Sequence, residues 1–331
     1  MHPIISKSII YFLLAVCGLF MVVPFIWMIS TSLMTQSEFN KNDAIFIPKE
    51  EYYVWNKDGV EHKIILVTER GSESVIHVLD ENNQIAAEYP EYMSVPSSEI
   101  EFVKKKPSIH LDNYTRAFRQ VPFATYFANT IFVSIVTLIG VFLTSILAAY
   151  AFARMEFKGS DFIFYLFLSM MIVPQPVYLI SSYMLLDKFN WLDTYYALIV
   201  PWCVNIFTIF LFRQHFKSLP QELFDAASID GCSTFGMLWR IVLPLSKPII
   251  ATASIFSLIS SWNSFMWPLV MVDRPELRVL QVGLSYFNQE ASTQTTLLMA
   301  ASTFSILPIL ILFFIAQKQI IASYSRSGLK D

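Results

Sequence analysis

The chain alternates between long uncharged apolar stretches and shorter polar segments. Six of these stretches reach or approach the roughly 20 apolar residues that a membrane-spanning helix requires. They are residues 8–34, 121–153, 162–186, 194–212, 248–272 and 291–316. We expect the prolines inside these stretches to form kinks that pack against neighbouring helices, because those helices can donate hydrogen bonds to the carbonyls that a proline leaves free. The pattern predicts an all-α polytopic membrane protein with six transmembrane helices.

A different pattern occupies the polar segment between the first two stretches. Residues 52–55 and 64–67 are strand-like and flank turn residues, and residues 74–79 and 84–87 repeat this arrangement around 80–83. Two hairpins therefore predict a small β-rich insert. We expect three regions: 1–36 with the first helix, 37–120 with the insert, and 121–331 as the transmembrane helical core that includes a polar loop, 213–248.

The distribution of lysine and arginine predicts the orientation in the membrane. One alternating set of loops is rich in these residues, whereas in the opposite short loops acidic residues offset them. The basic set comprises Lys7, Arg154, Lys158, Arg213, Lys217, Arg240, Lys247, Lys318, Arg326 and Lys330. Because basic loops stay in the cytoplasm, both termini are expected there and the β-rich insert outside. The first apolar run is too long for a signal peptide, so we expect it to be a retained anchor.

Composition supports lipid as the surrounding solvent. Of 331 residues, 55% are hydrophobic and 15% are charged, against about 45–50% and about 25% in soluble domains. The net charge of −3 gives no argument for a nucleic-acid partner.

The sequence contains none of the motifs considered for metal binding, phosphate binding or catalysis. The three cysteines form no CxxC and the five histidines no HExxH, so no metal site is predicted. The sequence has no GxxxxGK[ST] phosphate loop and no GxSxG elbow, and hence no catalytic residue is assigned. No charge lies well inside a predicted span, which argues against a proton-coupled carrier.

The 213–248 loop carries the most specific pattern. Ser218 and Gln221 fit a capping box, with Pro220 next to them, so a short helix is expected through 222–227. Gly231 suits the left-handed conformation that ends such a helix. A second amphipathic helix is expected from the spacing of Phe235, Leu238, Trp239 and Val242.

This loop resembles the EAA loop of binding-protein-dependent ABC importer permeases, with each spacing of that pattern kept. The matching residues are Asp225, Ala226, Ala227, Gly231, Ile241, Leu243 and Pro244. Asp225 stands where the family pattern has glutamate. Residues 148–154 (AAYAFAR), 172–176, 192–195 and 262–268 are similar to segments of carbohydrate importer permeases of the maltose-transporter type.

The resemblance implies a subunit that forms half of a sugar translocation pathway in the bacterial cytoplasmic membrane. It implies a second permease subunit, two ATPase subunits that use ATP and Mg, and an extracytoplasmic solute-binding protein. The helix around 225–231 would then be the coupling helix that docks on an ATPase. No cofactor is expected on this chain, which would not itself be an enzyme.

The sugar-path residues are candidates by chemistry alone. Amides suit a hydroxylated ligand and indoles can stack on sugar rings, which selects Gln175, Asn205, Trp262, Asn263 and Trp267. The competing interpretation is that intramembrane amides, Asn129 and Gln294 included, only bridge helices. A non-sugar cargo and an ATPase-independent secondary carrier are the alternative functions. The insert could contact the binding protein, brace the partner permease, or be a lobe without a role.

Overall fold

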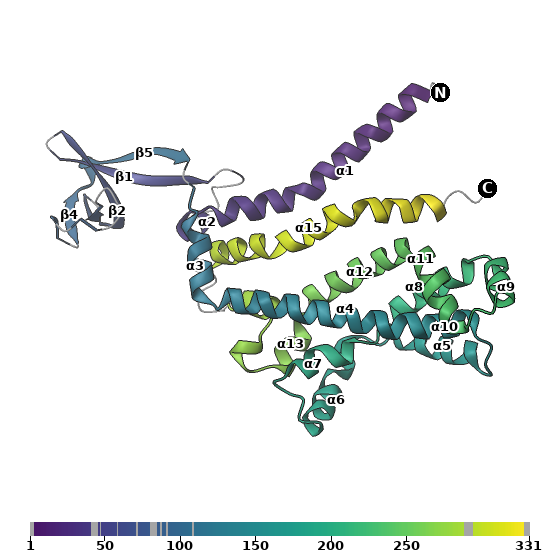
Figure 1. Cartoon of the computed structure of the whole chain (residues 1–331). Helices are drawn as coiled ribbons and strands as arrows, with labels where there is room; N and C mark the ends of the chain where they lie inside the picture. The colour runs from purple at the N-terminus through teal and green to yellow at the C-terminus, as the bar shows by residue number, and fades with distance from the viewer. Residues whose placement is uncertain are drawn as a thin grey trace. The chain divides into compact units, whose positions relative to one another are not determined.

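The computed structural model describes residues 3–327 except 41–45, 47, 58, 71, 80–84, 87, 91, 108 and 288–293. The chain forms two compact units. The first comprises Met1–Ala117 with Glu290–Thr303, and the second Phe118–Gln289 with Phe304–Asp331. Figure 1 shows the sheet of the first unit and the long helices of the second.

Two complete α-helices and an antiparallel sheet lie in the described part of the first unit. Helix α1 (Pro3–Ser32) is followed by α2 (Gln36–Asn40). The strands are β1 (Lys49–Lys57), β2 (Val60–Arg70), β3 (Glu73–Val78), β4 (Met93–Pro96) and β5 (Ile100–Pro107). Their order in the sheet is β4-β3-β2-β1-β5, and all neighbours are antiparallel. The predicted β-rich insert is therefore present.

One face of the sheet carries its core. Alternation along the strands places Trp55, Ile64, Ile76, Val78 and Val95 together, and the Trp55 indole donates a hydrogen bond to Glu99 at 2.9 Å. The first predicted hairpin is confirmed, because Tyr53 pairs with Ile64.

The second predicted hairpin is confirmed only near its predicted turn. Leu79 forms an isolated antiparallel bridge with Ile85, and the Ala86 N–H donates to the Val78 carbonyl at 2.8 Å. The earlier residues of β3 pair with β4 instead, and Ala86 and Tyr89 pack against the sheet core. Residues 84 and 87, like the predicted turn 80–83, lie outside the described residues.

The second unit is organised along α4 (Phe123–Arg154), which packs mainly on α8 (Ile206–Ser218) and α12 (Lys247–Trp262). Shorter helices surround these three. They are α5 (Ser160–Met170), α6 (Gln175–Lys188), α7 (Tyr195–Ile199), α9 (Gln221–Ile229), α10 (Thr234–Met237), α11 (Leu243–Leu245), α13 (Met266–Met271) and α14 (Leu280–Ser285). Helices α3 (Asp112–Gln120) and α15 (Thr295–Ser327) contribute to both units.

A glycine allows close packing along α4. A β-carbon at Gly140 would collide with the Sγ atom of Cys203. Thr144, one turn further on, donates a hydrogen bond to the Cys203 carbonyl at 2.6 Å. The pair therefore holds α4 against the irregular segment before α8.

Four helical segments among the described residues are long and apolar enough to cross a membrane: Ile9–Ser32, Phe123–Arg154, Tyr195–Ser218 and Thr295–Ile315. Two bent pairs raise the number to six if each pair crosses once. One pair is α5 with α6, at 100°, and the other is Thr234–Leu245 with α12, at 80°. Four candidate spans are thus present among the described residues, and the count of six remains a prediction.

Three predicted stretches are not continuous helices. Stretch 194–212 is divided into α7, the 3-10 helix Val200–Trp202 and α8. Stretch 162–186 breaks between α5 and α6, where Pro174 and Pro176 disfavour a continuing helix and Pro176 suits the first turn of α6. Stretch 248–272 breaks between α12 and α13. Pro268 has no N–H to bond the carbonyl of Ser264, which lies in that break.

Candidate functional site

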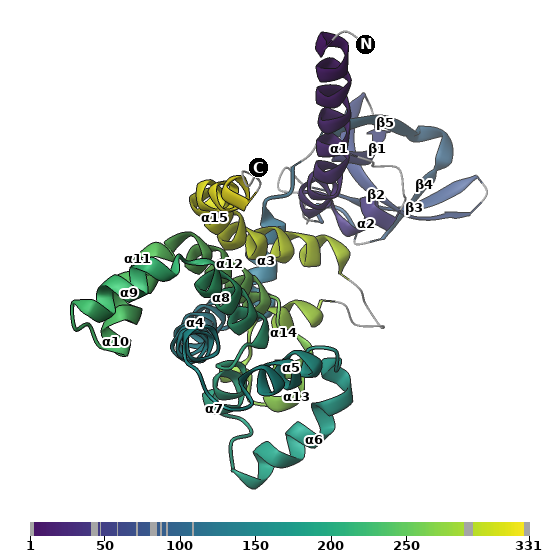
Figure 2. The same ribbon diagram turned by 90° about the vertical axis from the view of Figure 1, so that its right-hand side faces the viewer.

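The 213–248 loop folds into a compact group of short helices beside one end of α4 (Figure 2). The helix expected through 222–227 is α9, and Gly231 follows it with φ +73°. The Cys232 N–H donates to the Ala227 carbonyl at 2.9 Å, a bond typical of a left-handed helix end. The role predicted for Gly231 in ending the helix is confirmed.

The predicted capping box is wrong. The Ser218 hydroxyl donates to the His215 carbonyl at 2.8 Å, inside the last turn of α8. Pro220 precedes α9 without a side-chain cap. The Gln221 amide instead donates to Asp225 at 3.0 Å, and Arg154 donates to the Gln221 oxygen at 2.9 Å.

Part of the pattern that carries the resemblance is exposed on α9 and just after it. Asp225, Ala226 and Gly231 are exposed, whereas Ala227 is buried with Phe224. Large apolar side chains are also exposed on this loop, among them Ile229 at 86% and Phe235 at 60%. Small residues beside exposed apolar ones permit close approach of another surface.

The remaining residues of the pattern lie further along the loop. Ile241 is half-buried in a π-helical segment, Leu238–Val242, and Leu243 and Pro244 form the short helix α11 after it. Leu243 packs against the core of the second unit, whereas Pro244 is exposed. The structure thus brings all seven residues into one loop but not onto one face.

Arg154 connects the end of α4 to this loop. Its guanidinium donates to the carbonyls of Phe216 and Leu219, with the shortest N–O distance to each at 2.6 Å. Four residues earlier on α4, the Tyr150 hydroxyl donates to the Thr234 carbonyl at 3.0 Å. Both residues belong to the 148–154 segment, which stood out in the sequence only through its resemblance to other permeases.

A single apolar core joins the loop to the long helices. Phe224 of α9 and Leu238 and Val242 of the π-helical segment are buried in it. The other helices contribute Ala149, Tyr150, Phe152, Phe164, Ile209, Phe212, Phe216 and Ala253. Because close-packed cores transmit displacement, α9 is mechanically continuous with α4, α5, α8 and α12.

A second arginine braces the same region. Arg213 of α8 donates to the Phe152 carbonyl at 3.2 Å and to Asp161 at 2.8 Å. Its guanidinium also lies 3.8 Å from the centre of the Phe164 ring. Such a buried cation is tolerated because it is paired and stacked.

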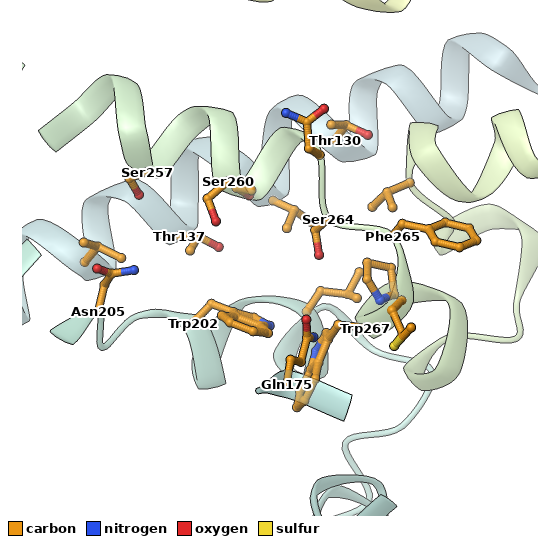
Figure 3. Close-up of a pocket in the computed structure, with 18 residues that line it drawn as sticks. Thr130, Thr137, Gln175, Trp202, Asn205, Ser257, Ser260, Ser264, Phe265 and Trp267 are labelled. Carbon is orange, nitrogen blue, oxygen red and sulfur yellow. The ribbon is translucent and has the colours of Figure 1, made fainter. Parts of the chain in front are cut away.

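Nearer the middle of α4, the second unit contains a cavity of about 370 Å³ (Figure 3). Its walls come from α4, α7, α12, α13, the first residue of α6 and the segments that precede α8 and α14. The lining residues are Thr130, Val133, Thr137, Val141, Gln175, Leu198, Trp202, Asn205, Ser257, Ser260, Ser261, Asn263, Ser264, Phe265, Met266, Trp267, Pro268 and Val279.

Four of the five sugar-path candidates line this cavity. They are Gln175, Asn205, Asn263 and Trp267. Trp262 does not line it, since its buried indole donates to the Ser305 carbonyl at 3.1 Å.

Several of the candidates already have structural partners. Asn205 accepts hydrogen bonds from the N–H and hydroxyl of Thr208 at 2.9 and 3.0 Å, which caps α8. The Trp267 indole donates to the Ala197 carbonyl at 2.9 Å. These contacts support the helix-bridging interpretation for part of the set.

Asn129 fits that interpretation fully. Its amide nitrogen donates to the carbonyls of Glu276 and Arg278 at 2.7 and 2.9 Å, and its oxygen accepts from Tyr195 at 2.8 Å. It ties the first turns of α4 to the loop between α13 and α14.

The hydroxyl residues of the cavity were not among the sequence-based candidates. Ser257, Ser260, Ser261 and Ser264 recur at helical spacing, and Thr137 occupies the facing side of α4. The i, i+3, i+4, i+7 pattern of serines in an apolar stretch was the signal that could have revealed them. In Figure 3 the side chains of Ser264 and Gln175 point toward one another across the cavity.

The fold and its candidate spans define the class as an integral membrane protein. Residues 140–326 match the family described as binding-protein-dependent transport system inner membrane component. The chain belongs to this family, whose subunits lie in the inner membrane. The family resemblance drawn from the 213–248 loop is confirmed.

Some relatives are named for the sugars that they carry. The chain is similar to the arabinooligosaccharides transport system permease protein AraQ of Halalkalibacterium halodurans, with 33% identity over 75% of this chain and 89% of that protein. It is 32% identical to the sulfoquinovosyl glycerol transport system permease protein SmoH of Agrobacterium fabrum, over 66% of this chain and 78% of that protein.

Among solved structures, the chain resembles one from a bacterial ABC transporter involved in the import of the acidic polysaccharide alginate. The TM-score is 0.67 at 20% identity, and the match covers 96% of both chains. This similarity shows the fold.

Proposed function

We propose that this chain is a permease subunit of an ATP-driven sugar or oligosaccharide importer and forms half of the translocation pathway. ATP and Mg are used by two separate ATPase subunits, and the chain itself binds no cofactor. A second permease subunit completes the pathway, and an extracytoplasmic solute-binding protein delivers the sugar.

The observation that carries the proposal is the construction of the 213–248 loop. Helix α9 exposes Asp225 and Ala226 while its inner side is fixed in the core shared with α4, α8 and α12. A surface of this kind can receive a displacement from a docked ATPase and pass it to the long helices as a rigid-body motion.

A sugar cargo is supported by two independent points. The two relatives above are named for the transport of sugars or sugar derivatives, and the cavity offers hydroxyls and amides. A non-sugar solute is the alternative within the same transporter class. A secondary carrier is less well supported, because no lining residue of the cavity is charged.

The orientation follows from the basic loops. We place both termini and the 213–248 loop in the cytoplasm and the β-rich insert outside. On that side the insert would contact the binding protein or brace the partner permease, since cargo is transferred there.

Co-purification from native membrane tests the proposal. We expect mass spectrometry to find two ATPase copies, a second permease and a binding protein, and a screen of sugars to find one that stimulates ATP hydrolysis. A chain that purifies without an ATPase, or a complex that no sugar stimulates, would contradict it.

A further inference from the structure

Two buried polar atoms at the cavity have no hydrogen-bond partner within the described chain. They are Oγ1 of Thr137 and Nε1 of Trp202. Thr137 is only 4% exposed. A buried donor without a partner lowers stability, so a group that arrives from outside the chain is the natural partner for both atoms.

Both atoms face the same space. In Figure 3 the Thr137 oxygen and the Trp202 nitrogen point toward the region between Ser260, Ser264 and Gln175. Thr137 lies on α4 and Trp202 on the short 3-10 helix Val200–Trp202. The two groups would therefore approach a ligand from different walls.

The orientation of Trp202 is itself fixed. Its ring contacts Trp267 edge to face, with centroids 5.2 Å apart, and the Trp267 indole is anchored on the Ala197 carbonyl. An indole held in this way is preorganised to donate its N–H, which limits the entropy lost on binding.

We propose that this cavity is a binding site within this chain for uncharged sugar rings of the cargo, with Thr137 and Trp202 as hydrogen-bonding residues. Hydroxyl groups of a sugar both donate and accept, so they match the serine and threonine hydroxyls and the Gln175 amide of the wall. This inference rests on the proposed function, and it specifies that the sugar is uncharged.

The absence of charge from the described wall selects against anionic sugars. A carboxylate or sulfonate inside the cavity would lose its hydration without a cation to pair with. The volume, about 370 Å³, is at the lower end of the 300–1,000 Å³ typical of small-molecule sites. The cavity thus suits a short neutral segment rather than a long or acidic chain.

The test uses the complete transporter in proteoliposomes, with arabinotriose and maltotriose as neutral probes and an alginate trisaccharide as the acidic probe. Thr137→Val and Trp202→Phe keep the shape of each side chain and remove its polar atom. For the neutral probe that the transporter accepts, we expect the KM of uptake to rise roughly three- to tenfold in each variant. The alginate trisaccharide should not be taken up.

Matched controls are available on the same helix. Ser134 and Ser145 are buried residues of α4 whose hydroxyls also lack a partner in the described chain, but they do not line the cavity. Ser134→Ala and Ser145→Ala should leave the KM unchanged. Thr137→Val should unfold no more readily than the parent, because it removes an unpaired buried hydroxyl.

The outcomes separate the two proposals. If a neutral sugar drives ATP hydrolysis but Thr137→Val and Trp202→Phe behave like the serine controls, the site is wrong and the importer function stands. Uptake of the acidic probe in preference to both neutral ones would also overturn the site. If no sugar stimulates ATP hydrolysis by the parent complex, the importer function itself fails.

Discussion

The guanidinium carbon of Arg154 lies 3.9 Å from the centre of the Phe224 ring. Arg154 ends α4 and Phe224 belongs to α9, so this contact connects a long helix to the 213–248 loop. The same guanidinium donates to the backbone carbonyl of Phe216, in the last turn of α8, and to that of Leu219, which follows α8. Arg154 is therefore a positioning residue for the proposed coupling helix.

Replacing Arg154 by alanine is expected to uncouple ATP hydrolysis from transport. The carbonyls of Phe216 and Leu219 would lose their donor and Phe224 its cation, so α9 could tilt without moving α4. We expect the sugar taken up per ATP hydrolysed to fall about tenfold or more while the ATPase still co-purifies.

Two further variants sharpen that measurement. Arg154→Lys should restore coupling only in part, because an ammonium lacks the planar fork that serves several acceptors. Lys158→Ala removes an exposed cation from the neighbouring loop and should leave coupling unchanged. Equal coupling ratios in all three variants would contradict a positioning role for Arg154.

A bulky residue at Ala226 should weaken the association with the ATPase. Ala226 is exposed, so Ala226→Trp leaves the folded core intact. The added ring would hold a docked surface away from α9, and we expect at least a tenfold loss of co-purified ATPase. The amount of co-purified partner permease provides the internal control. Undiminished ATPase in the Ala226→Trp preparation would show that α9 is not the docking surface.

Close packing at Gly140 gives a stability prediction. Gly140→Ala would force its new methyl group into Cys203, which should cost about 1–3 kcal/mol of unfolding free energy. A methyl group added at Gly18 of α1 would meet no other atom within 4 Å, so Gly18→Ala should be neutral or slightly stabilising.

A double substitution checks the cause of that loss. Cys203→Gly removes the colliding atoms, so combining it with Gly140→Ala should show a favourable interaction energy in a double-mutant cycle. Thermal unfolding in detergent measures all four proteins. Strict additivity of the two substitutions would mean that the destabilisation arises elsewhere.

Removal of the β-rich insert tests its proposed contact with the outer partners. Lys49 pairs with Pro107 at the base of the sheet, so a short Gly-Ser linker can replace the residues between them. We expect the deletion to keep the membrane core and its ATPase but to lower uptake and the affinity for the binding protein. If both quantities match those of the full chain, the insert has neither role.

Local patterns predicted the elements that depend on nearby residues. Alternation around Gly59 indicated the hairpin of β1 and β2, and Gly231 marked the end of α9 through its tolerance of positive φ. Long uncharged stretches indicated the long helices, because a helix that crosses the lipid bilayer needs about 20 apolar residues. These features can be predicted without knowing which segments lie close together in the folded chain.

Features that depend on distant contacts were not predicted. Strand β4 pairs with β3 because Val95 completes a core with Ile76 and Val78. No local pattern shows that the nearer residues Ile85 and Ala86 pair only with Leu79 and Val78. Arg154 finds its acceptors more than 60 residues away. Among the residues that line the cavity, the amides could be selected from the sequence because they are polar residues in apolar stretches. Thr137 and Trp202 could not be selected in this way, because their importance depends on the opposite walls of the cavity.

The π-helical segment Leu238–Val242 sets the rotational phase of the helices after it. A π-turn accommodates one residue more than an α-turn does, and each residue of an α-helix turns the chain by about 100°. Deleting one residue here would rotate α12 so that its serines leave the cavity wall, although no residue of α9 or of the cavity wall had been replaced. The number of residues in the 213–248 loop, and not only the identity of its side chains, is therefore constrained.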